Sequence, residues 1–279
     1  MKNAMQLKAY VKNLAKEKKI SAQIVLQNYM LERLLERISV SKYHDNFILK
    51  GGFLLAAMVG LDTRATMDMD ATIKGLPVTK ETISGMFVDI CKTHIDDDIS
   101  FEFRGIDDIR EDDEYGGYRV SLTGNYPPMA VPLKIDITTG DKITPREMVY
   151  SFNLMFEERS INVLAYTVET ILAEKLETII SRGNQNTRPR DYYDVYILNT
   201  LQKQNIDNQI LKEAFAATVK KRGTGHIVAN YKEIIETVAN STVMNNQWTR
   251  YQKEFEYAKE ISFENTCKAV NELIVGIEE

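Results

Sequence analysis

Two aspartates stand one residue apart in residues 64–73, RATMDMDATI, a segment otherwise rich in strand-forming and apolar side chains. Residues i and i+2 of a strand point to the same side, so this spacing predicts that the carboxylates of Asp68 and Asp70 share one face. Like charges at such short range repel, and burying them is costly unless a cation lies between them. The spacing therefore predicts a site for a positively charged group.

A third carboxylate comes from residues 133–138, LKIDIT, in which apolar and polar residues alternate. If the apolar set faces the core, Asp136 lies on the opposite face, where it could approach Asp68 and Asp70 from a neighbouring strand. Three carboxylates at one place suit Mg²⁺, which prefers oxygen ligands and shares them with substrate phosphates. Two such ions can activate an attacking oxygen and neutralise a leaving pyrophosphate. The alternative is that these acids are surface residues of half-buried strands.

A pair of glycines precedes the aspartates, in residues 50–53, KGGF. We expect a helix to begin at this pair, because the residues that follow are continuously apolar. Without a Cβ at Gly51 or Gly52, a phosphate could reach the backbone N–H groups at the helix start, where the helix dipole favours an anion. The alternative is that the pair forms only a turn.

The remaining pattern predicts the elements that position these residues. Two amphipathic helices fill the first forty residues, and the second begins at Ser21, a favourable N-cap. A helix is expected over about 80–94, and five strand-like segments follow between residues 99 and 166. From Val168 the pattern is helical almost to the end. The expected fold is α+β, with a mixed sheet flanked by helices in residues 1–166 and a helical domain in residues 167–279.

Composition narrows the class of protein. Hydrophobic residues make up 44% and charged residues 27% of the 279 residues, which is typical of a globular protein, and no apolar run has the length of a membrane span. Two distant cysteines and three scattered histidines argue against a zinc site, and we expect a cytoplasmic protein without a membrane partner. The net charge is −5, yet residues 1–50 carry +6 and residues 89–114 carry −8. This uneven distribution permits a surface that binds nucleic acid.

Four segments together resemble a known family. Residues 49–70, LKGGFLLAAMVGLDTRATMDMD, have the glycine pair and spaced acids of the nucleotidyltransferase superfamily. More narrowly, they resemble the first motif of the AbiEii/AbiGii toxins, the MenT-like nucleotidyltransferases of type IV toxin–antitoxin systems. Residues 133–138 are similar to the second motif of that family. Residues 169–182, ETILAEKLETIISR, and 188–196, RPRDYYDVY, are similar to its third and fourth. The four occur in the family's order.

The resemblance implies a role for each matching residue. Lys175 would bring a positive charge to the triphosphate, Asp191 would position Lys175 or the attacking hydroxyl, and Asp194 would tie its helix to an arginine. Arg64 would either hold a phosphate or brace the acidic strand. Ordinary surface roles remain the alternative for each. The implied set is therefore catalytic Asp68, Asp70, Lys175 and Asp191; metal-binding Asp68, Asp70 and Asp136; and NTP-binding Lys50, Gly51, Gly52, Arg64 and Thr66.

The resemblance also implies a function. It suggests a bacterial toxin of a toxin–antitoxin or antiviral abortive-infection system, in which an Mg²⁺-dependent nucleotidyltransferase moves a nucleoside monophosphate from an NTP to the 3′ acceptor end of tRNA and so blocks translation. A cognate AbiEi-like antitoxin would be a partner. The basic N-terminal helices and residues 220–226, KKRGTGH, are candidates for binding the RNA backbone. Two alternatives remain: an acceptor that is a protein or small molecule, or a non-catalytic protein with a vestigial nucleotide site.

Overall fold

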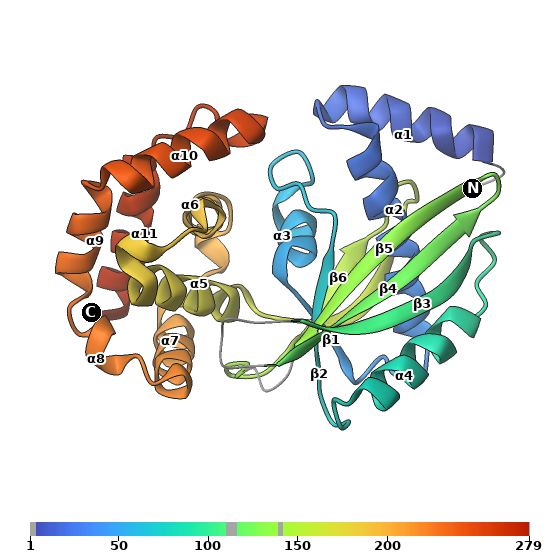
Figure 1. Ribbon diagram of the computed structural model, residues 1–279, viewed down its shortest axis with the longest axis horizontal. Helices are drawn as coiled ribbons and strands as arrows, with labels where there is room; N and C mark the ends of the chain where they lie inside the picture. Colours follow the sequence, from blue (N-terminus) through green and yellow to red (C-terminus); the bar gives the residue numbers. More distant parts are fainter. Residues whose placement is uncertain (1–3, 110–115, 139–141, 279) are drawn as a thin grey trace. The chain divides into compact units, whose positions relative to one another are not determined.

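The computed structural model describes residues 4–109, 116–138 and 142–278 (Figure 1). Residues 110–114 of the acidic segment therefore lie outside the described residues. The chain forms two compact units, of which the first is Met1–Asp141 with Met148–Ala165 and the second is Lys142–Glu147 with Tyr166–Glu279. Hydrogen bonds explain why the short segment 142–147 belongs with the second unit. The backbone N–H of Thr144 donates to Thr170 Oγ1, and Thr170 Oγ1 donates to the carbonyl of Thr144.

The first unit is built on one seven-stranded sheet of order β3-β4-β5-β2-β1-β7-β6. The pairs β2–β5 and β1–β7 are parallel and the other four pairs are antiparallel, so the sheet is mixed, as predicted. The strands are β1 (Phe47–Lys50), β2 (Met69–Ile73), β3 (Ser100–Ile109), β4 (Gly117–Tyr126), β5 (Met129–Thr138), β6 (Met148–Asn153) and β7 (Ser160–Ala165). The five strand-like segments predicted after residue 99 correspond to β3–β7.

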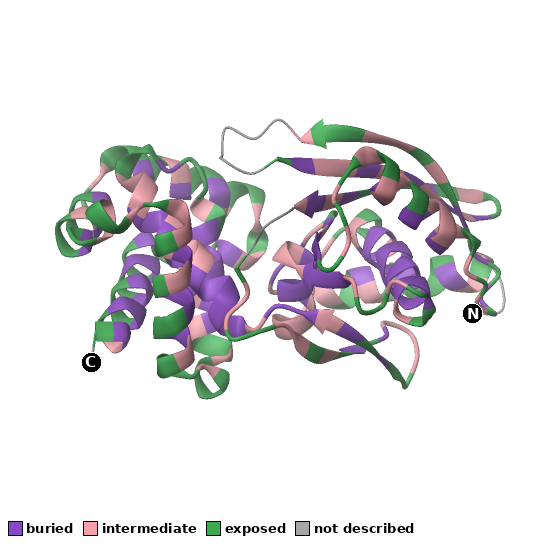
Figure 2. Ribbon diagram, turned by 90° about the horizontal axis from the view of Figure 1, so that it is seen from below, coloured by how far each residue is buried: buried purple, intermediate pink, exposed green. Residues whose placement is uncertain are grey.

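Four helices accompany the sheet. They are α1 (Ala4–Lys18), α2 (Ala22–Val40), α3 (Gly51–Val59) and α4 (Lys80–Lys92). The Ser21 side chain accepts a hydrogen bond from the N–H of Ile24, so it caps α2 as predicted. Helices α2 and α4 pack against each other and against the sheet, and buried residues gather between them and the strands (Figure 2). Alternate residues of β5 are buried, which leaves Asp136 on the face opposite the buried set.

Helix α2 carries charged residues into the core of the first unit. Arg33 and Arg37 are among the largest fully buried side chains. Arg37 donates two hydrogen bonds to Asp97, at 2.9 and 2.7 Å. Glu32 accepts from Arg33 at 2.8 Å and from the backbone N–H of Met155 at 2.6 Å. Even so, burial raises the pKa of Glu32 to about 7.

The second unit is helical, as predicted (Figure 1). Its α-helices are α5 (Val168–Arg182), α6 (Pro189–Leu201), α7 (Asn208–Arg222), α8 (Gly225–Val228), α9 (Tyr231–Ala239), α10 (Thr242–Glu254) and α11 (Phe263–Glu278). An aromatic cluster supports the packing: Trp248 lies 5.5 Å from Tyr251 and 5.9 Å from Phe263, between ring centroids. In the described part of the chain, no helix is long and apolar enough to cross a membrane.

Candidate active site

Asp70 and Asp136 are direct partners on the parallel strands β2 and β5. Paired residues of adjacent strands point to the same face, so the two carboxylates lie side by side. The structure differs from the sequence prediction at Asp68, because β2 begins at Met69 and Asp68 lies exposed in the segment just before it. Its negative charge still acts on Asp70. The register of the sheet thus brings Asp70 and Asp136 together, while Asp68 lies just before the strand.

We define the acid group as Asp68, Asp70 and Asp136, of which Asp70 and Asp136 are half-buried and Asp68 is exposed. Burial raises the pKa of the Asp70 carboxyl, and the charges of Asp136 and Asp68 raise it further. Lys50, which pairs with Asp70 across β1 and β2, acts in the opposite direction. The backbone N–H of Gly52 also lowers this pKa, by donating to Asp70 Oδ2 at 3.3 Å. The net effect is a site that favours an added positive charge or a proton.

The glycine pair lies directly against Asp70. Helix α3 begins at Gly51, whose φ of +65° is a conformation that other residues rarely adopt. A Cβ at this position would stand 2.1 Å from Asp70 Oδ2, and one at Gly52 would stand 2.9 Å from Thr66 Oγ1. The glycines therefore allow the start of α3 to approach the acidic strand. This contact was not part of the sequence prediction, which concerned phosphate binding alone.

Arg64 and Thr66 lie on the other side of Gly52. Arg64 is 3% exposed and donates from Nη1 to the carbonyl of Ala65 at 2.6 Å. Its Nη2 would be 3.3 Å from a Cβ at Gly52, so the guanidinium packs against the start of α3. The two roles expected of Arg64, holding a phosphate or bracing the acidic strand, stay predictions. Thr66 is half-buried, and its Oγ1 donates to the carbonyl of Asp68 at 3.3 Å.

Two side-chain amides of α2 form hydrogen bonds with the backbone of the segment just before Asp68. Asn28 Nδ2 donates to the carbonyl of Thr66 at 2.7 Å. Gln27 Nε2 donates to the carbonyls of Met67 at 3.2 Å and Pro132 at 2.8 Å, so it joins this segment to β5. Sequence reasoning did not find these residues. The only signal in the sequence is that both are amides on a strongly apolar helix, and their partners depend on tertiary structure.

Arg119 is a further residue that sequence reasoning missed. It lies opposite Asp136 in the antiparallel pair β4–β5. Its Nε donates to Asp136 Oδ1 at 2.8 Å and its Nη2 donates to Asp136 Oδ2 at 2.7 Å. The hydrogen bond with Asp136 raises the pKa of Arg119, and the charges of Asp68 and Asp70 contribute in the same direction. Because Arg119 alternates with the buried residues Val120 and Leu122, the sequence indicates which face of the strand it lies on. The sequence does not indicate the register that places it opposite Asp136.

The acid group has the donor chemistry that a divalent ion requires. Its oxygens are carboxylate oxygens, which hard cations prefer, and burial, with a smaller contribution from the charges of Asp136 and Asp68, raises the pKa of Asp70. Within the described ranges, however, no three His, Cys, Asp or Glu side chains are arranged as a complete metal-binding group. Asp136 is bonded to Arg119 at both oxygens. Asp68 and Asp70 thus fit as the first ligands, and Asp136 would join them after rearrangement.

A second cluster lies within the helical unit. Lys175 of α5 bonds Asp191 Oδ1 at 3.0 Å and Asp194 Oδ2 at 2.7 Å, and both aspartates are on α6. Asp191 is 2% and Asp194 is 0% exposed, so Lys175 neutralises two buried carboxylates. Arg188 Nε lies 3.0 Å from Asp191 Oδ2. The structure therefore joins the third and fourth sequence motifs, with both Asp191 and Asp194 bound to Lys175.

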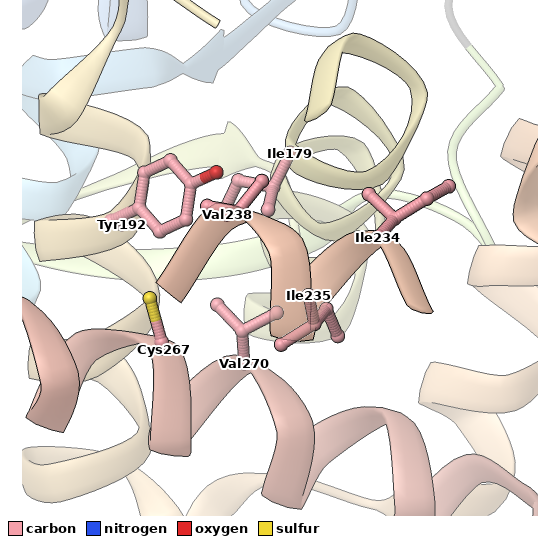
Figure 3. A pocket seen from close by; sticks show the side chains of 7 residues that line it. All are labelled: Ile179, Tyr192, Ile234, Ile235, Val238, Cys267 and Val270. Atoms are coloured by element: carbon pink, nitrogen blue, oxygen red, sulfur yellow. The ribbon is translucent and has the colours of Figure 1, made fainter. Parts of the chain in front are cut away.

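The helical unit also has a small pocket, which carries no site. Figure 3 shows its lining by Ile179, Tyr192, Ile234, Ile235, Val238, Cys267 and Val270. Although the space between these side chains amounts to about 200 Å³, none of it admits a water-sized sphere. Five of the seven lining residues are aliphatic, and the other two are Tyr192 and Cys267. We interpret it as imperfect packing between α5, α6, α9 and α11.

With this geometry in view, comparisons with known proteins identify the family. A family model described as nucleotidyl transferase AbiEii toxin, type IV TA system, matches residues 33–269. The chain belongs to the AbiEii toxin family. The resemblance seen in the four sequence segments is thereby confirmed, and the AbiEii protein is a nucleotidyltransferase. Membership implies an NTP as co-substrate, a divalent metal in most cases, and an antitoxin partner.

Solved structures are similar to this AbiEii protein at low sequence identity. JHP933 from Helicobacter pylori is 15% identical, with a TM-score of 0.50 over 92% of this chain and 93% of that one. A proposed nucleotidyltransferase from H. pylori is 14% identical, with a TM-score of 0.49 over 93% and 96%. An antigenic nucleotidyltransferase-like protein from Paracoccidioides brasiliensis is 16% identical, with a TM-score of 0.40 over 76% and 93%. No curated protein matches the chain.

Proposed function

We propose that this AbiEii protein uses Mg²⁺ to transfer a nucleoside monophosphate from an NTP to the 3′ acceptor end of tRNA in the cytoplasm, and so blocks translation. One observation carries the proposal: Asp70 and Asp136 are in register on parallel strands, directly against the glycine-initiated helix α3. Acids at a sheet beside a helix N-terminus provide oxygen ligands for the metal and N–H donors for phosphate in one place. Nucleotidyl transfer needs both.

We assign the residues of the first unit to metal binding or to phosphate binding according to their surroundings. Asp68 and Asp70 would hold Mg²⁺, with Asp136 as a further ligand, and Lys50 offsets part of the negative charge on Asp70. The metal, when bound, supplies positive charge that activates the acceptor oxygen and stabilises the leaving pyrophosphate. Gly51 and Gly52 keep the start of α3 free of side chains on the phosphate side. Arg64 and Thr66 lie against that helix start, from where both would help orient the NTP.

The Lys175 cluster supplies the second contribution. Asp191 and Asp194 hold the ammonium group of Lys175 between two buried carboxylates. We assign Lys175 to the triphosphate as a point charge and Asp191 to positioning Lys175. Arg188 keeps Asp191 neutralised from its second oxygen, so that Lys175 need not satisfy it alone.

A face of lysines on α1 favours RNA as the acceptor. Lys8, Lys12 and Lys16 recur every four residues, so they lie on one side of the helix, and all three are exposed. In the described ranges none of them pairs with a carboxylate. The next lysine along, Lys18, lies 3.4 Å from Asp62, which anchors the end of α1 to the loop before Arg64. A row of unpaired cations attracts a polyanionic backbone.

The experiment is to incubate the purified protein with each labelled NTP, Mg²⁺, and either total cell RNA, purified tRNA or cell protein. We expect label in the tRNA fraction, a gain of nucleotides at the 3′ end on sequencing, and no transfer by Asp70→Asn. If label appears only in protein or in a small molecule, the proposed tRNA acceptor is wrong, whereas the assignment as a nucleotidyltransferase stands. An identical product from Asp70→Asn would overturn the assignment of the site. Co-purification of an AbiEi-like antitoxin would test the expected partner separately.

A further inference from the structure

Arg119 is bonded to Asp136 of the acid group at both carboxylate oxygens. Its two hydrogen bonds to Asp136, at 2.8 and 2.7 Å, form the planar fork that suits a carboxylate. The charges of Asp68 and Asp70 also favour its positive form, so the guanidinium lies within the field of all three acids. A divalent ion would be attracted to the same field.

The geometry makes these two cations competitors. The fork occupies both oxygens of Asp136, and with Arg119 in place the described residues contain no complete metal-binding group. A metal ligand must turn an oxygen towards the ion at about 2.0–2.1 Å for Mg²⁺, with little tolerance in angle. Asp136 is therefore held by Arg119 in one orientation and beside a positive charge, and both disfavour a divalent ion on the same carboxylate.

The position of Arg119 allows it to leave Asp136. Its side chain is 40% exposed, whereas that of Asp136 is 17% exposed. A long side chain with an exposed head can swing into water at little desolvation cost, while the aspartate stays at its place in β5. The Gly52 N–H and Lys50 would continue to neutralise Asp70 during the exchange. The acid group would exchange Arg119 for the divalent ion without losing all of its neutralising partners.

We propose that Arg119 is a resident counter-ion that competes with the divalent ion for Asp136, so that metal loading displaces it. Before metal binds, Arg119 stabilises the acid group and withholds Asp136. After displacement, Asp136 completes the site. The inference rests on the proposed function, since it requires the acid group to bind metal, but it assigns a role to a residue outside the family motifs.

The test measures Mn²⁺ binding without NTP, by electron paramagnetic resonance and calorimetry at fixed ionic strength. Arg119→Gln removes the competing charge, so we expect Mn²⁺ to bind about tenfold more tightly or better, corresponding to about 1.4 kcal/mol. Arg119→Lys, which keeps the charge but loses the fork, should lie between the two. Arg104→Gln is the matched control: Arg104 forms a pair with Glu102 on β3 and should not alter Mn²⁺ binding.

Thermal unfolding adds a readout that a merely structural arginine would not give. We expect Arg119→Gln to melt below the wild type in EDTA, because Asp136 loses its bonded counter-ion, and to recover in saturating Mn²⁺. Unchanged or weaker Mn²⁺ binding by Arg119→Gln would overturn the inference and make Arg119 a fixed support of Asp136. If Mn²⁺ binding by the wild type is absent, or unaffected by Asp68→Asn and Asp70→Asn, the proposed function itself fails.

Discussion

Gly51 and Asp70 approach so closely that no side chain fits between them. A Cβ on Gly51 would lie 2.1 Å from Asp70 Oδ2, and the residue has a φ of +65°. Both the contact and the backbone angle require glycine. The glycine pair of the first motif therefore shapes the acid group directly, as well as leaving the helix start open to phosphate.

We expect Gly51→Ala to lower the free energy of unfolding by at least about 2 kcal/mol, because it adds a clash to backbone strain. Nucleotide transfer should fall with it, since Asp70 must move. Urea unfolding and incorporation of labelled nucleotide measure the two effects. Gly85→Ala is the control: Gly85 lies exposed within α4 with no neighbour near its Cβ position, and alanine there should stabilise the helix by about 0.5–1 kcal/mol. Equal stability of the two variants would contradict the packing argument.

Asp70→Asn should separate activity from stability. Burial and neighbouring acids raise the pKa of Asp70, so its charged form is disfavoured in the folded protein at neutral pH. Removing that charge should leave the Tm at pH 7.5 equal to or above that of the wild type. Transfer should fall by about a thousandfold, as expected when several kcal/mol of charge stabilisation are lost. Asp108→Asn, at an exposed ion pair with Lys80, should change neither. A marked fall in the Tm of Asp70→Asn would argue against this electrostatic interpretation.

Lys175 cannot be tested by a single substitution. Lys175→Met leaves Asp191 and Asp194 as buried carboxylates without that partner, at a cost of about 3–5 kcal/mol. The double variant Lys175→Met/Asp194→Asn removes one of these charges and leaves Asp191 with Arg188. We expect the double variant to regain part of the lost stability without regaining transfer. Asp194→Asn alone is the control for folding, and a stable double variant with normal transfer would exclude the catalytic role.

The lysine face of α1 predicts a salt-dependent contact with RNA. Changing Lys8, Lys12 and Lys16 together to Gln should weaken tRNA binding and reduce the slope of log K against log salt by about 2–3. Transfer at saturating tRNA should change little, because these residues are outside the acid group. The same change at Lys203, Lys212 and Lys253, which are exposed in the helical unit, is the charge-matched control. Equal salt slopes for the two triple variants would remove α1 from the RNA surface.

Glu32 predicts that the stability of the first unit depends on pH. Its folded-state pKa is raised to about 7 by burial, so protonation stabilises the fold. This contribution is complete below the ordinary pKa of glutamate and is lost as the pH rises through about 7, on the order of 3 kcal/mol in total. Hydrogen exchange of α2 amides at pH 5–8 measures it. Glu32→Gln should flatten the dependence, whereas Glu17→Gln, exposed on α1, should not.

Most of the elements could be predicted from the sequence because their periodicity is local. The strand-like alternation around Asp136 and the Ser21 cap depend only on neighbouring residues. Register does not: the pairing of Arg119 with Asp136 requires β4 and β5 to align at one of several possible offsets. The start of β2 at Met69, which leaves Asp68 outside the strand, depends on the same tertiary pairing.

Long-range polar contacts also could not be predicted from the sequence. In the sequence, segment 142–147 comes between two strands of the first unit. The hydrogen bonds between Thr144 and Thr170 nevertheless attach it to the helical unit. Such contacts join residues with no local pattern in common, so they emerge only when the chain is folded. The four motifs, by contrast, indicated both clusters because each motif is a contiguous segment.

The amides of Gln27 and Asn28 have a practical consequence for anyone trimming this protein. Both precede residue 33, where the match to the family model begins, yet they secure the carbonyls of Thr66 and Met67 beside the acids. A shortened version that starts at the family boundary would lose these anchors. If such a version failed to act on RNA, the cause would be a displaced loop beside the acids. The result would not test whether the N-terminal helices are needed to recognise RNA.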